Sequence, residues 1–278
     1  ADPERAKEML SYVFGRQRRN FGIHSRYIDG TILEPGFELD ELVAPLLALE
    51  RYINKTDDKS ILNDSDIAQG ISLILNPLRQ HEAASCRLYD TFLQPTDDEH
   101  VYPYITYDNV LVWKALKDLA QLAPQYAHLE KTADEIKDAI MTHCVQKDAE
   151  GKPYFGWSID LNGSHDVYDE PPGSLQLLPF FDFCSPNDEI YRNTVAMIRS
   201  PEYKYSFANS PINEIGCPHA PHPWILSLAN SLLCGRVEHC RAILEKISMD
   251  NGIACESVDE VTGYCTTGEA FATCAGFL

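Results

Sequence analysis

The chain has 278 residues, of which 44% are hydrophobic, and this excludes a largely disordered protein because so much apolar surface can fill a large core. Its 42 acidic and 23 basic side chains give a formal charge of −19. Such a charge repels phosphate backbones and anionic lipid heads, so we expect neither nucleic acid nor a membrane as a partner.

The nine cysteines are odd in number and follow no regular spacing. In a chain of this length they indicate reduced, mostly buried thiols and a cytoplasmic protein. No stretch approaches 18 uninterrupted apolar residues, and no basic segment followed by an apolar one opens the chain. We therefore expect neither a membrane-spanning helix nor a signal peptide.

Amphipathic patterns with the helical period recur along the chain, while the alternating pattern of strands is nearly absent. The expected fold class is therefore all-α. In chain order the patterns predict helices over residues 4–14, 39–53, 66–75, 109–122, 129–144, 173–183, 188–199, 224–233, 237–248 and 269–278.

Strongly apolar helices alternate with more charged ones in this prediction. The apolar helices begin about 50 to 70 residues apart, the length of one helical hairpin with its loops. Each follows a loop rich in Gly, Pro, aromatic and acidic residues, so a closed ring gathers these loops at one end. We predict one domain over residues 1–278, an (α/α)6 toroid, and the apolar run 271–278 suggests that it is incomplete at the C-terminus.

Two acids, Asp169 and Glu170, stand before Pro171-Pro172 at the predicted start of an apolar helix. Carboxylates are stabilised at such a position by backbone N–H groups and by the helix dipole. The segment is therefore consistent both with a helix cap and with a catalytic acid.

A third acid, Glu256, follows the Asp250-Asn251-Gly252 turn and is flanked by small and apolar residues that can desolvate it. Alone it is either a surface acid or a general base. Together with Asp169 it is more informative, because inverting glycoside hydrolysis needs an acid and an opposed carboxylate about 6.5 to 9.5 Å apart.

The stretch from Asp169 to Ser174 resembles the acid segment of the glucoamylase family, and residues 256–259 with 267–272 resemble its base segment. The resemblance implies Asp169 as general acid, Glu170 as a binder of sugar hydroxyls and Glu256 as general base. Glucoamylases have Glu at the acid position, whereas Asp169 suits the metal-independent exo-α-1,6-mannosidases of the same six-hairpin superfamily. Glu170 is the alternative acid.

Residues 37–42 and 216–220 also resemble those mannosidases. Asp108 and Trp224 have alternative roles, as a helix cap and as a core residue. The residues expected to contact an oligosaccharide or glycoside substrate are Glu38, Asp40, Asp108, Glu170, His219, His222 and Trp224.

A metal site is not expected. Cys217, His219 and His222 offer ligands, but their spacing matches no paired metal-binding motif. Phosphate-binding glycine loops are absent too, so we predict no cofactor. The sequence thus predicts an inverting exo-α-glycosidase for α-glucosides or α-mannosides. The alternatives are a sugar epimerase or isomerase that uses His219 and His222, and a non-catalytic helical-repeat scaffold.

Overall fold

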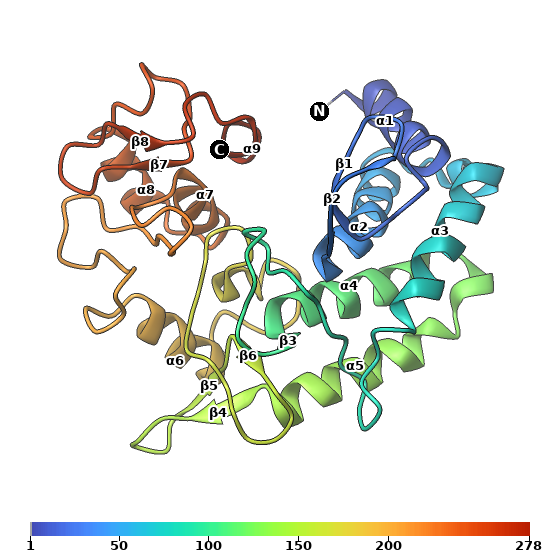
Figure 1. The fold of residues 1–278 in the computed structure, drawn as a ribbon, viewed down its shortest axis with the longest axis horizontal. Helices are drawn as coiled ribbons and strands as arrows, with labels where there is room; N and C mark the ends of the chain where they lie inside the picture. The colour runs from blue at the N-terminus through green and yellow to red at the C-terminus, as the bar shows by residue number, and fades with distance from the viewer. Residues whose placement is uncertain (1) are drawn as a thin grey trace. The chain divides into compact units, whose positions relative to one another are not determined.

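The computed structural model describes residues 2–278 and divides the chain into two compact units (Figure 1). The N-terminal unit comprises the residues up to 144 together with 158–164, and the C-terminal unit comprises 145–157 with 165–278. Within the described residues, nine α-helices and only short strands are present, which confirms the all-α prediction. The prediction of a single domain remains a prediction.

The N-terminal unit contains five α-helices, two 3₁₀ helices and four short strands. Its elements are α1 (Pro3–Gly15), β1 (Ile23–Arg26), β2 (Ile32–Phe37), α2 (Leu39–Thr56), η1 (Lys59–Asn63), α3 (Ser65–Leu78), β3 (Tyr104–Ile105), α4 (Thr106–Leu122), η2 (Pro124–Tyr126), α5 (Leu129–His143) and β6 (Ser158–Ile159). The strands pair antiparallel, β1 with β2 and β3 with β6.

In this unit α4 packs against both α2 and α5 (Figure 1). Buried residues cover all faces of α4, whereas α5 buries only one stripe with the helical spacing, namely Leu129, Ala133, Ile136, Ala139 and Ile140. A helix buried on every face belongs to the interior, and one with a single apolar stripe covers it. The predicted alternation of apolar and charged helices is confirmed for this pair.

The C-terminal unit contains shorter helices and more irregular chain. Its elements are β4 (Val145–Lys147), β5 (Pro153–Phe155), η3 (Leu175–Leu177), α6 (Glu189–Ile198), α7 (Ile225–Leu233), α8 (Val237–Leu244), β7 (Ser257–Val258), β8 (Cys265–Thr267) and α9 (Ala272–Phe277). Antiparallel pairs join β4 to β5 and β7 to β8.

The interior helix of this unit is α7, which packs against α8 and α9 (Figure 1). Its residues 225–231 are all buried, whereas α8 buries only Cys240 and Ile243. Around α7 lies a core of mostly small and aliphatic side chains that also includes Trp224 and Cys255. The same pairing of an apolar and a charged helix therefore recurs here.

One predicted helix is wrong. Residues 173–183 form only the 3₁₀ turn η3, followed by irregular chain. Pro179 has no N–H to continue the hydrogen bonding of a helix. Asp182 has a positive φ of 60°, which also lies outside a right-handed helix. An apolar segment can therefore be buried without being helical.

No helix among residues 2–278 combines the length and the apolar character required to span a bilayer.

Candidate active site

The predicted site residues fall into two groups. Asp169, Glu170, Glu256, His219, His222 and Trp224 all lie in the C-terminal unit, whereas Glu38, Asp40 and Asp108 lie in the N-terminal unit. Both predicted catalytic carboxylates are therefore part of one compact unit, although they are far apart in the sequence.

Asp169 is fully buried, and both of its carboxylate oxygens accept hydrogen bonds from the chain that follows. Ser174 Oγ donates to Oδ2 and the Leu175 backbone N–H donates to Oδ1, each at 2.8 Å. Pro171 and Pro172 keep the intervening chain out of a helix, so it loops back and η3 begins beside the carboxylate. The sequence thus fixes Asp169 at the start of a buried turn.

Burial raises the pKa of Asp169 to about 7, against the opposing effect of the hydrogen bonds from Leu175 and Ser174. A carboxylic acid with such a pKa holds its proton near neutrality and can transfer it, which is the requirement for a general acid. Its neighbour Glu170 is also fully buried and accepts a hydrogen bond from Tyr168 Oη at 3.0 Å.

A polar network lies behind Asp169. Gln176 Nε2 donates to Ser174 Oγ at 3.1 Å, and Arg199 Nε donates to Gln176 Oε1 at 2.5 Å. The Arg199 guanidinium also donates to the fully buried Glu214 at 3.1 Å. An ordered chain of hydrogen bonds therefore runs from Asp169 to a buried ion pair.

Glu214 is the centre of that ion pair. Ser227 and Ser231 donate to it at 2.7 and 2.8 Å, and His239 Nε2 lies 2.6 Å from Oε1. These partners, together with Arg199, hold the pKa of Glu214 below its usual value despite the burial. Sequence reasoning missed Glu214, because a lone acid in an irregular segment carries no periodic signal.

Glu256 is positioned by backbone hydrogen bonds on both sides. Its N–H donates to the carbonyls of Thr267 and Gly268 at 3.2 and 3.1 Å, and its own carbonyl accepts from the Ile225 N–H at 3.0 Å. The side chain is 12% exposed, and Oε1 lies 3.9 Å from Nε2 of His219. Unlike Asp169, this carboxylate retains access to solvent.

The two catalytic candidates are anchored to the same helix. At the first residue of α7, Ile225 binds the carbonyl of Glu256, and further along Asn230 Nδ2 donates to the carbonyl of Pro171 at 2.7 Å. These anchors are separated by about 7.5 Å along the axis, at about 1.5 Å of rise per residue. A rigid interior helix therefore connects the two segments.

The other predicted contacts of this unit differ in exposure. His219 has a half-exposed side chain, and His222 Nδ1 lies 3.0 Å from Oε2 of Glu260. Trp224 is 4% exposed, and its indole N–H donates to the carbonyl of Ala220 at 2.9 Å. Its ring lies in the core of the unit and contacts His219 edge to face, with ring centroids 6.0 Å apart. Trp224 thus supports the loop that carries His219.

In the N-terminal unit, Glu38 and Asp108 are buried, and Oδ1 of Asp40 is buried and accepts no hydrogen bond among residues 2–278. Burial and nearby negative charges, with Asp40 foremost, raise the pKa of Glu38 to about 9. Burial likewise raises the pKa of Asp40 to about 7. These acids stand at the start of α2 and on the first turn of α4.

Comparison with known families identifies the group to which these features belong. The sequence model of a family described as metal-independent alpha-mannosidase (GH125) matches residues 81–276. The meiotically up-regulated gene 157 protein of Schizosaccharomyces pombe is 27% identical over 190 residues. That match covers 63% of this chain but only 37% of the yeast protein, so the chain spans well under half of this relative's length.

Solved structures give the fold. A metal-independent α-mannosidase of Streptococcus pneumoniae, in a non-productive complex with α-1,6-mannobiose, matches with a TM-score of 0.80 at 18% identity, covering 98% of this chain and 77% of its own. The glucoamylase of Saccharomycopsis fibuligera matches with a TM-score of 0.71 at 13% identity, covering 99% of this chain and 79% of its own. The predicted (α/α)6 glycosidase fold class is therefore confirmed.

Proposed function

Because the chain belongs to the family of metal-independent α-mannosidases, we propose that it hydrolyses α-mannosides from a chain end by general acid and base catalysis. Asp169 protonates the glycosidic oxygen as the bond to the anomeric carbon breaks. Glu256 accepts a proton from the water that attacks the same carbon from the opposite face, and the released sugar has the inverted configuration.

The observation that carries this proposal is the contrast between the two carboxyl groups. Burial of Asp169 raises its pKa to about 7, a value suited to a proton donor. Glu256 keeps 12% of its side chain exposed beside His219, where a water molecule can reach it. A buried acid that can give up a proton and a second carboxyl group that water can reach are the two parts that inverting hydrolysis requires.

Glu170 is proposed to bind a sugar hydroxyl, with Tyr168 orienting its carboxylate through their 3.0 Å hydrogen bond. His219 is proposed to position the nucleophilic water or a hydroxyl beside Glu256. For Glu38, Asp40, Asp108, His222 and Trp224, contact with the substrate remains a proposal based on the resemblance of their segments to those of the mannosidases.

Hydrolysis is tested with the purified chain and α-1,6-mannobiose, with maltose as the α-glucoside for comparison. Proton NMR of the first product should show mannose in the β-configuration, while maltose is cleaved far more slowly. Release of α-mannose first contradicts inversion, and faster cleavage of maltose contradicts the choice of sugar.

The roles of the carboxylates are tested with Glu256→Gln, which should abolish turnover of mannobiose while the circular dichroism spectrum stays unchanged. Glu260→Gln is the matched control, since Glu260 follows in the same loop and pairs with His222 instead. If Glu256→Gln keeps most of the activity, Glu256 is not the base.

We also propose a reducing compartment such as the cytoplasm, because all nine cysteines are free thiols and five of them are buried. Alkylation of the unfolded protein from its native source without reductant, followed by peptide mapping of residues 1–278, should count nine reactive thiols. A lower count that reductant restores would indicate disulfides and an oxidising compartment.

A further inference from the structure

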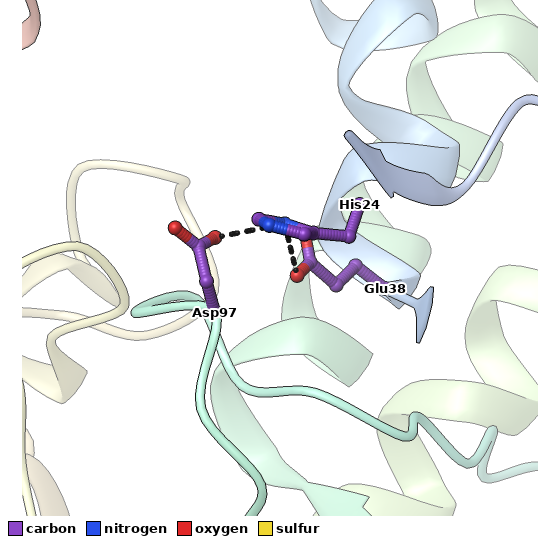
Figure 2. A group of neighbouring side chains, drawn as sticks. All are labelled: His24, Glu38 and Asp97. Carbon is purple, nitrogen blue, oxygen red and sulfur yellow. Dashed lines mark ion pairs between the residues drawn. The ribbon is translucent and has the colours of Figure 1, made fainter. Parts of the chain in front are cut away.

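We infer that His24, Glu38 and Asp97 of the N-terminal unit form a binding site for one divalent cation that accepts both nitrogen and oxygen ligands, such as Mn²⁺ or Zn²⁺. The three side chains come from strand β1, from the residue before α2 and from the turn around residue 97, and they converge on one point (Figure 2). Their donor atoms all lie within 4.8 Å of one another.

The two distances from the imidazole nitrogen to the carboxylate oxygens are those of neighbouring ligands around one ion. Nδ1 of His24 lies 3.0 Å from Oε1 of Glu38 and 3.3 Å from Oδ1 of Asp97 (Figure 2). With metal–ligand bonds of about 2.0 to 2.2 Å, neighbouring ligands of a tetrahedral or octahedral site are about 3.0 to 3.4 Å apart. A cation can therefore lie between these atoms without a large movement of the side chains.

A second observation concerns hydrogen bonding. Glu38 is 2% exposed, and its Oε1 lies 3.0 Å from the buried Nδ1 of His24, yet neither atom makes a hydrogen bond of acceptable geometry within residues 2–278. Buried polar atoms are nearly always satisfied, and those that are not call for an explanation such as an ion. Both atoms are directed toward the centre of the group (Figure 2).

The local charge also favours a cation. Oε2 of Glu34 lies 3.4 Å from Nε2 of His24, so three carboxylates surround one imidazole. Of the nearby basic groups, Arg26 is paired with Glu41 at 3.5 Å. Imidazole together with carboxylates suits Mn²⁺ or Zn²⁺ better than Mg²⁺ or Ca²⁺, which prefer oxygen ligands throughout.

Such an ion would join three separated segments in the N-terminal unit and would not take part in bond cleavage. The competing arrangement is a protonated His24 held between carboxylates. It predicts no response to added metal, so the two are readily distinguished.

The test uses the full chain after treatment with EDTA, titrated with Mn²⁺ and followed by the electron paramagnetic resonance signal of the free ion. Mn²⁺ is chosen because it has little affinity for the nine thiols of this protein. We expect one Mn²⁺ per chain and a rise in the melting temperature on binding. Mg²⁺ at the same concentration should leave the melting temperature unchanged.

Two variants locate the ion. Asp97→Asn and His24→Gln should each lower the affinity for Mn²⁺ at least about tenfold. Asp97 is exposed, so its variant should retain the fold even if the change at His24 disturbs it. His81→Gln is the matched control, since His81 is another partly buried histidine paired with one aspartate, Asp90 at 2.7 Å, and it should bind Mn²⁺ normally.

The inference is overturned if the native chain binds no Mn²⁺ up to millimolar concentration. It is overturned equally if Asp97→Asn binds as tightly as the native chain, because the ion is then elsewhere. Neither result depends on whether the chain hydrolyses mannosides.

Discussion

Asp169 and Glu256 are held in place in different ways. The carboxylate of Asp169 is fully buried and both oxygens accept hydrogen bonds, with a polar network behind them that ends at Glu214. Glu256 is positioned mainly by its backbone, with Gly268 packed against its side chain, and it remains partly exposed. A proton donor needs a raised pKa, which the burial of Asp169 provides. A base that activates water needs contact with water, which the partial exposure of Glu256 permits.

The largest expected effect is a loss of kcat, and its dependence on the leaving group of the substrate should distinguish Asp169 from Glu256. We expect Glu256→Gln to lose about 10²- to 10⁴-fold in kcat on both mannobiose and dinitrophenyl α-mannoside. Asp169→Asn should lose as much on mannobiose but less than about tenfold on the aryl mannoside, because a good leaving group needs no proton. Equal losses of Asp169→Asn on both substrates contradict the acid assignment, and the same selective pattern in Glu170→Gln transfers it to Glu170.

Disrupting the buried polar network behind Asp169 should destabilise the protein more than removing an exposed ion pair. Glu214→Ala leaves the guanidinium of Arg199, whose side chain is 14% exposed, without its carboxylate. We expect a loss of about 3 kcal/mol in the free energy of unfolding, measured by urea denaturation. Glu238→Ala removes an exposed pair with Arg241, at 80% and 63% exposure, and should cost less than about 1 kcal/mol. Similar losses in both variants contradict the structural role of the network.

The support behind Glu256 should be sensitive to one methyl group. In Gly268→Ala the new Cβ would lie 2.5 Å from Cβ of Glu256, at a φ of 59°. We expect about 1 to 3 kcal/mol of destabilisation and a loss of activity, because the clash displaces the carboxylate. Gly252→Ala is the control, since its φ is 87° but nothing lies within 4 Å of the new Cβ. The Gly252→Ala variant should lose stability but keep the kcat/KM of the native chain. Full activity in Gly268→Ala contradicts this prediction.

The smallest effect should appear in the pH profile. Ser174→Ala removes a hydrogen bond that lowers the pKa of Asp169, so that pKa should rise further above its usual value. A general acid acts in its protonated form, so activity is lost as the pH rises through its pKa. The alkaline limb of kcat/KM should therefore shift to higher pH, by about one unit. An unchanged limb, or a shift to lower pH, indicates that another group is the acid.

The amino-acid sequence by itself was sufficient to predict the position of the helices that have a clear apolar stripe. Helices α1 to α5 begin and end within a few residues of their predicted bounds, since period and caps are local properties. The sequence also placed Asp169 shortly before two prolines, and Glu256 after a glycine turn. The helix predicted over 173–183 is wrong because burial there depends on neighbours, and a run of apolar residues does not specify backbone conformation.

Only the tertiary structure decided which of these residues share an environment. The sequence could not show that α7 anchors both Pro171 and Glu256, or that His24, Glu38 and Asp97 converge, because these contacts join segments distant along the chain. It could not identify Glu214 either, since a buried acid is recognised by its partners. Side-chain periodicity records which face of an element is buried, whereas desolvation and hydrogen bonding arise when the elements pack together.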